Sequence, residues 1–69
     1  MKLSARNVLK GRVVAITPGA VNVEVVIEIA PAVQVVSIIT KSSAESLGLA
    51  IGKEAYAVVK ASSVMVAVD

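Results

Sequence analysis

The sequence contains no cysteine, histidine, tryptophan or phenylalanine, and its single aromatic residue is Tyr56. Without cysteine and histidine the chain has no disulfides and none of the common soft metal sites. It also lacks the side chains that most often act as nucleophile or general base, so we expect a binding protein without a cation site or cofactor, not an enzyme. One tyrosine cannot supply the stacking platforms that barrels use on single-stranded nucleic acid, and we expect no nucleic-acid partner.

The chain also lacks a long uninterrupted apolar run, although 57% of its residues are hydrophobic. A membrane-spanning helix needs about 20 consecutive, predominantly apolar residues. Residues 1–4 lack the apolar core of a signal peptide. We therefore expect a cytoplasmic protein without membrane association. Charged or polar residues interrupt every candidate span: Lys10, Arg12, Glu24, Glu28, Gln34, Lys41 and Lys60.

Charge is scarce too, at 17% of 69 residues, with a formal net charge of +2. The length predicts one domain, residues 1–69, and so small a domain buries only about 60% of its unfolded surface. Exposed apolar patches usually mark interfaces. We therefore expect an obligate oligomer, the alternative being a monomer with unusual packing.

Alternating apolar residues, mostly β-branched, predict strands. Gly11 lies mid-strand, where glycine marks a bulge, a bend or a close backbone approach. In the second strand the odd positions from Val21 to Ile29 should form the core, and in the fourth Tyr56 and Val58 share the face of Lys60. The expected strands are residues 7–17, 21–29, 33–40, 54–60 and 62–68.

A short helix is expected between the third and fourth strands. Ser42 and Glu45 have the spacing of a capping box, and Gly48 is placed to follow a helix that runs to about Leu47. Three strands, a helix and two strands predict an all-β fold, a five-stranded Greek-key barrel of the oligonucleotide/oligosaccharide-binding type. The third strand is apolar on both faces, which predicts that a second subunit covers one of them.

Three clusters of hydroxyls and cations lie beside these strands, at residues 4–7, 40–43 and 60–63. Arg6 can form two parallel hydrogen bonds to an oxyanion, and Lys60 can act as a point charge. Thr40 and Ser43 flank a helix start, where unpaired N–H groups attract anions. For each cluster there is a structural alternative: a solvated terminal segment, a helix cap and a surface lysine, respectively.

In these clusters and the strands between them the chain resembles the molbindins, the small Mop-type molybdate-binding proteins, and the related domains of molybdate transporters and regulators. The resemblance covers essentially the whole chain. It departs at Val8, where relatives often carry a polar residue, and at Ala30-Pro31-Ala32, which replaces a glycine-rich hairpin. The matching segments are Ser4-Ala5-Arg6-Asn7 with Leu9-Lys10-Gly11, Gly19 with residues 21–24, Ser37-Ile38-Ile39-Thr40, residues 43–49 with Gly52, and residues 57–65.

The resemblance implies storage or buffering of molybdate, with tungstate as a second candidate, at subunit interfaces of a hexamer built as a trimer of dimers with exchanged strands. The main site would comprise Ser4, Ala5, Arg6, Thr40, Ser43, Lys60, Ala61 and Ser62. A second oxyanion site would lie at the turn Gly19, Ala20 and Val21. The alternative is a structural or regulatory, oxyanion-sensing module of the same fold that has no storage role.

Overall fold

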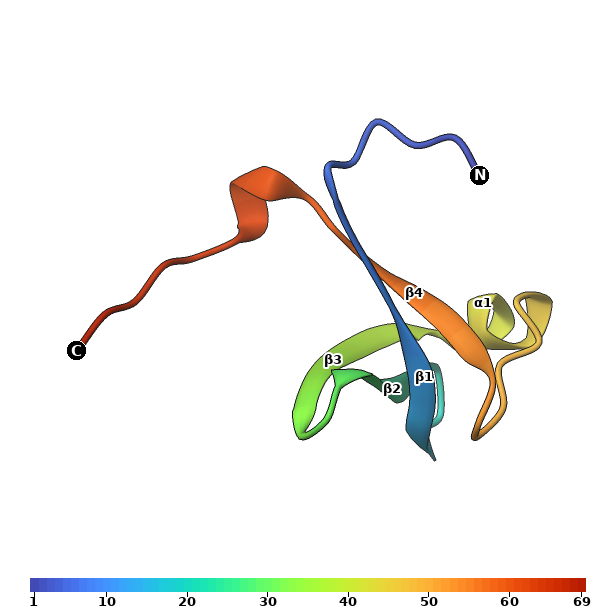
Figure 1. Cartoon of the computed structure of the whole chain (residues 1–69). Coiled ribbons are helices and arrows are strands. Elements are labelled where there is room, and N and C mark those ends of the chain that lie inside the picture. The colour runs from blue at the N-terminus through green and yellow to red at the C-terminus, as the bar shows by residue number, and fades with distance from the viewer.

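The computed structural model describes all 69 residues, and its fold is a single curled antiparallel sheet with one short α-helix (Figure 1). The strands are ordered β3-β2-β1-β4 in the sheet. This confirms the all-β class and the helix between the third and fourth strands. The elements are β1 (Asn7–Pro18), β2 (Asn22–Ala30), β3 (Val33–Thr40), α1 (Lys41–Ser46), β4 (Glu54–Val59) and the 3₁₀ turn η1 (Ala61–Ser63).

The core is very small and lies on β1, β2 and β4. Only five of the 69 residues are buried. Three of them alternate along β2, as the pattern predicts, whereas Val21 lies outside the strand and is 71% exposed. The buried residues are Val13, Val23, Val25, Ile27 and Ala57.

Gly11 marks a close backbone approach, one of the three possibilities that the sequence left open. A Cβ atom there would overlap the carbonyl oxygen of Glu28 and contact Ile27 Cγ2 at 2.8 Å. The bulge of β1 lies further along, between Val13 and Ala15. Together these features let the long strand β1 curl between its two neighbours.

The fifth strand predicted over residues 62–68 is absent from the single chain. Ala61–Ser63 forms η1, and the residues after it extend away from the sheet without a partner strand (Figure 1). The reason is physical: a strand needs a neighbour for its backbone hydrogen bonds, and no strand of the same chain lies beside this segment. Its side chains are correspondingly exposed, with Met65 at 94% and Val68 at 93%.

The helix is placed correctly, but its cap is not the predicted one. Thr40, not Ser42, is the N-cap residue, and its Oγ1 accepts a hydrogen bond from the backbone N–H of Ser43 at 3.1 Å. Gly48 follows the helix with a φ of +62°, in the expected role. The helix has six residues, and no helix in the structure is long and apolar enough to cross a membrane.

Candidate functional site

A surface depression of about 570 Å³ lies where the N-terminal segment meets the end of β4. It brings together six of the eight residues predicted for the main site. The ladder between β1 and β4 explains this, because Asn7 pairs with Val59 and so places residues 4–6 beside residues 60–62. The lining residues are Ser4, Ala5, Arg6, Val58, Lys60, Ala61 and Ser62.

The polar side chains of this depression are donors. Arg6 contributes a guanidinium, Lys60 an ammonium, and Ser4 and Ser62 hydroxyls, and no carboxylate lines the space. The ion pair of the structure lies elsewhere, between Lys10 Nζ and Glu54 at 3.4 Å. Both cations of the depression therefore remain available to an anion.

Backbone N–H groups add to this set. In η1 the hydrogen bonds run from Ser63 N–H to Lys60 O and from Val64 N–H to Ala61 O. The N–H groups of Ala5, Ala61 and Ser62 donate no hydrogen bond within the chain. Unpaired donors beside two cations form an environment in which an anion is well stabilised.

The remaining two predicted residues, Thr40 and Ser43, form a separate hydroxyl cluster at the start of α1. Thr40 Oγ1 lies 2.7 Å from Ser43 Oγ and 3.3 Å from Ser42 Oγ. The sequence predicted unpaired N–H groups at this helix start, but two of them are paired. Ser43 N–H donates to Thr40 Oγ1, and Lys41 N–H donates to Val21 O at 2.9 Å. Capping is therefore a demonstrated role of Thr40.

The two clusters lie at opposite ends of β1 in one chain. Asn7, the first residue of β1, pairs with Val59 beside the depression. Pro18, the last residue of β1, pairs with Val23, and the neighbouring residue Asn22 pairs with Thr40. β1 has 12 residues, and a strand rises about 3.3 Å per residue. Figure 1 likewise shows α1 well removed from η1. A single chain thus does not bring all eight predicted residues together.

The predicted second site, the turn after β1, is partly occupied by its own hydrogen bonds. Gly19 N–H donates to Asn22 O at 2.8 Å, so this N–H is already paired. The N–H groups of Ala20 and Val21 donate no hydrogen bond within the chain. No cationic side chain belongs to the turn itself. The turn is joined to the start of α1 by the hydrogen bond from Lys41 N–H to Val21 O.

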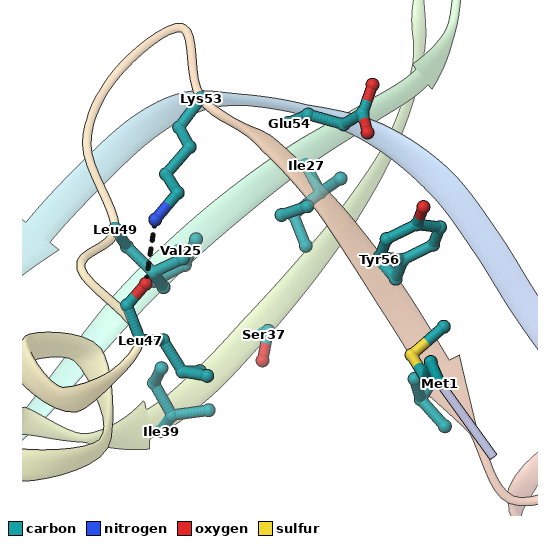
Figure 2. Close-up of a pocket in the computed structure, with 12 residues that line it drawn as sticks. Met1, Val25, Ile27, Ser37, Ile39, Leu47, Leu49, Lys53, Glu54 and Tyr56 are labelled. Atoms are coloured by element: carbon teal, nitrogen blue, oxygen red, sulfur yellow. Dashed lines mark hydrogen bonds between the residues drawn. The ribbon is translucent and has the colours of Figure 1, made fainter. Parts of the chain in front are cut away.

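An apolar groove of about 400 Å³ separates the unpaired edges of β3 and β4 (Figure 2). Its floor includes Val25 and Ile27 of β2, and Tyr56 lies on its β4 side. Lys53 closes one end by donating from Nζ to Leu47 O at 2.9 Å and to Gly48 O at 3.1 Å. The sheet therefore does not close into a barrel between β3 and β4.

Val58 is the one lining residue of the oxyanion depression that the sequence analysis did not assign to the site. It also lines the apolar groove, so it stands between the two spaces. The sequence contains the information needed to place Val58 near the site. Residues two apart on a strand share a face, and Val58 precedes Lys60 by two positions.

Comparison with known proteins now assigns this arrangement to a family. The family model described as the TOBE domain matches residues 3–66. A probable molybdenum-pterin-binding protein of Haemophilus influenzae is 49% identical over 69 residues, covering 100% of both chains. The chain therefore belongs to the TOBE-domain family, among the small molybdenum-pterin-binding (Mop) proteins.

Solved structures agree with this assignment. MopII from Clostridium pasteurianum superimposes with a TM-score of 0.91 at 48% identity, covering 97% of this chain and 100% of that one. The cytoplasmic molybdate-binding protein ModG, in a form with molybdate bound, gives a TM-score of 0.84 at 44% identity, covering 88% of this chain and 43% of that one. The recognised resemblance to the molybdate-binding Mop proteins is thereby confirmed.

Proposed function

We propose that the protein binds molybdate, or tungstate, at sites shared between copies of a homo-oligomer, and that it stores or buffers the oxyanion in the cytoplasm. The ligand class is supported by the similar solved structures, two of which are named as molybdate-binding proteins. The observation that carries the proposal is the depression itself, which gathers Arg6, Lys60, hydroxyls and unpaired N–H groups without a carboxylate. Molybdate is a tetrahedral dianion with no proton to donate at neutral pH, so donors are what it requires.

The separation of the two clusters supports a site shared between copies. Arg6 and Lys60 are exposed in the single chain, as are Thr40 and Ser43. Joining the depression of one copy to the Thr40–Ser43 cluster of another would surround an anion on two sides. An anion bound there stabilises the oligomer by mass action, because it binds the assembled state and not the separated chains.

The surface area supports an oligomer independently. A compact monomer of 7.0 kDa is expected to expose about 4,000 Å², whereas this chain exposes 5344 Å². The excess of about 1,300 Å² exceeds the roughly 800 Å² that each partner buries in an interface of standard size. The single chain is thus less compact than a folded monomer of its size.

The same chain offers a complementary pair of surfaces for this assembly. Residues 64–69 are extended and all but the last, Asp69, are apolar, with Met65, Val66 and Val68 each at least 88% exposed. The groove between β3 and β4 is apolar and has a free strand edge on each side. Insertion of this segment into the groove of a second copy would supply the fifth strand of each barrel, and three such dimers would make the proposed hexamer.

Calorimetric titration with molybdate tests the binding proposal. Arg6→Ala and Lys60→Ala are each expected to weaken molybdate binding about 10- to 100-fold, because a hydrogen bond to a charged group contributes about 1.5–3 kcal/mol. Arg12→Ala is the matched control, since Arg12 is an exposed cation on β1 that lines a different depression with Glu28 and Glu54. Circular dichroism establishes that each variant remains folded.

Unchanged affinity in both site variants would contradict the assignment of the depression. A wild-type protein that assembles but takes up no molybdate would instead favour the structural or regulatory module as its function. Tungstate titrated in the same way compares the two candidate ligands directly.

A further inference from the structure

We propose that Asp69 of one copy binds Lys53 of another, and that this ion pair anchors the C-terminal segment, residues 64–69, in one direction within the groove between β3 and β4. The inference rests on the proposed function, because it concerns the exchange of this segment between copies. The observations behind it are the course of the chain after β4 and the charges at the two ends of the groove.

Asp69 is the only charged residue of the C-terminal segment, whose other five side chains are apolar. The segment and β4 (Glu54–Val59) both have six residues, and six residues of strand span about 20 Å. An inserted segment therefore runs the length of β4 and places Asp69 at one of its two ends. The direction of insertion decides whether Asp69 lies beside Lys53, which precedes β4, or beside the oxyanion depression, which follows it.

The course of the chain favours the end at Lys53. After η1 the segment extends away from its own sheet and does not turn back along β4 (Figure 1). Only four residues, 60–63, separate β4 from the segment, so in a two-fold dimer the ends of the two β4 strands lie close together. Each segment then enters the groove of the other copy where that copy's β4 ends, and it runs antiparallel to this strand toward Lys53.

The charges favour the same direction. Inserted the other way, the carboxylate of Asp69 would lie among the cations of the oxyanion depression and compete with an anion for them. Glu54 also lines the groove near Lys53, but it is paired with Lys10 at 3.4 Å. Lys53 itself pairs with no carboxylate in the single chain, so its charge is available to Asp69.

Lys53 is also held in position to receive a carboxylate. Its Nζ donates to Leu47 O at 2.9 Å and to Gly48 O at 3.1 Å (Figure 2). These bonds use two of the three N–H donors of an ammonium group and leave the third without an acceptor. Because the side chain is already ordered, forming the ion pair costs less side-chain entropy than it does for a free surface lysine.

A double-mutant cycle of the full chain tests the pair. Asp69→Asn and Lys53→Met are each expected to raise the midpoint concentration of oligomer dissociation, by about two- to fivefold for each pair lost. Analytical ultracentrifugation at low salt without molybdate measures the midpoint. Asp69→Asn should have no further effect in the Lys53→Met background, because the partner is then already absent.

Glu45→Gln is the matched control for this cycle. Glu45 is an exposed carboxylate on α1 that does not line the groove. Its substitution should have the same effect with Lys53 present and with Lys53→Met.

Disulfide formation tests the direction of insertion, because the chain has no cysteine of its own. The double variant Lys53→Cys with Asp69→Cys is expected to form a covalent dimer on oxidation, since a disulfide requires Cα atoms within about 7 Å. Val58 lines both the groove and the oxyanion depression, at the other end of β4. The double variant Val58→Cys with Asp69→Cys should therefore remain unlinked.

Additive effects of Asp69→Asn and Lys53→Met, or a cross-link to position 58 in place of position 53, would overturn the pairing and leave the oxyanion site unaffected. A wild-type chain that binds no molybdate, while the coupling and the cross-link are both observed, would overturn the proposed function and support the pairing.

Discussion

Arg6 and Lys60 illustrate what single residues reveal in this chain. Their type made both candidates for an anion site, the family resemblance assigned them to the main site, and the structure places them in one depression. The alternation predicted the two strands that Arg6 and Lys60 flank. Only the β1–β4 register, which pairs Asn7 with Val59, places the two cations side by side. Titration of Arg6→Ala and Lys60→Ala with molybdate tests whether the two cations bind the anion together.

Thr40 was predicted less completely. Its hydroxyl was assigned to an anion, and the structure shows it capping α1 and contacting Ser43 Oγ at 2.7 Å. The sequence offered Ser42 as the cap because Ser42 and Glu45 have the right spacing. The strand extends to Thr40 and the helix starts directly after it, so the cap falls two residues earlier.

Ala32 gives a stability prediction at the residue scale. It is the one non-glycine residue with a positive φ, at +60°, in the turn between β2 and β3. A side chain in this region costs about 1–2 kcal/mol, which glycine avoids. Ala32→Gly is therefore expected to stabilise the protein by about 0.5–1 kcal/mol after the entropic cost of glycine.

Urea unfolding at a fixed protein concentration measures this change. Ala30→Gly is the control, because Ala30 lies in the same hairpin without a positive φ. It should destabilise the protein. A lower unfolding midpoint for Ala32→Gly would show that the turn does not carry the expected strain.

At the scale of elements, four strands and the helix were predictable and the fifth strand was not. β2 is the clearest case, since Val23, Val25 and Ile27 alternate and are buried. Residues 64–68 are apolar at every position, and most are β-branched, which also favours a strand. A strand nevertheless forms only where a neighbouring strand pairs with it. Composition indicates the tendency to form a strand and cannot indicate which chain supplies the neighbour.

Removal of residues 64–69 tests the role of the C-terminal segment. We expect the truncated chain to lose its oligomeric state, because it lacks the apolar side chains proposed to fill the groove of a second copy. Analytical ultracentrifugation at several concentrations measures this. The substitution Val66→Asp in the full chain disturbs the segment less than its removal. It should weaken assembly, because the new charge would enter an apolar groove.

An unchanged mass for the truncated chain would contradict this use of the segment. The groove would then need another occupant, and the oligomer would have to form through a different surface. Two exposed residues on the outer face of β3, Val36 at 59% and Ile38 at 67%, offer such a surface.

For the whole molecule, the small number of buried residues, five of 69, indicates that the single chain is less compact than a folded monomer. The chain has a radius of gyration of 12.7 Å, against about 11 Å expected for a compact domain of its length. The sequence indicated this through its high apolar fraction and small size. It could not indicate that the predicted site divides between the two ends of β1, because that depends on which strands pair and in which register.

Native mass spectrometry of the full chain, titrated with molybdate in excess sulfate, tests most directly whether shared oxyanion sites hold this assembly. We predict a hexamer that gains a discrete number of molybdate adducts and becomes harder to dissociate as they bind. A monomer, or an oligomer that takes up no molybdate, would contradict the proposal.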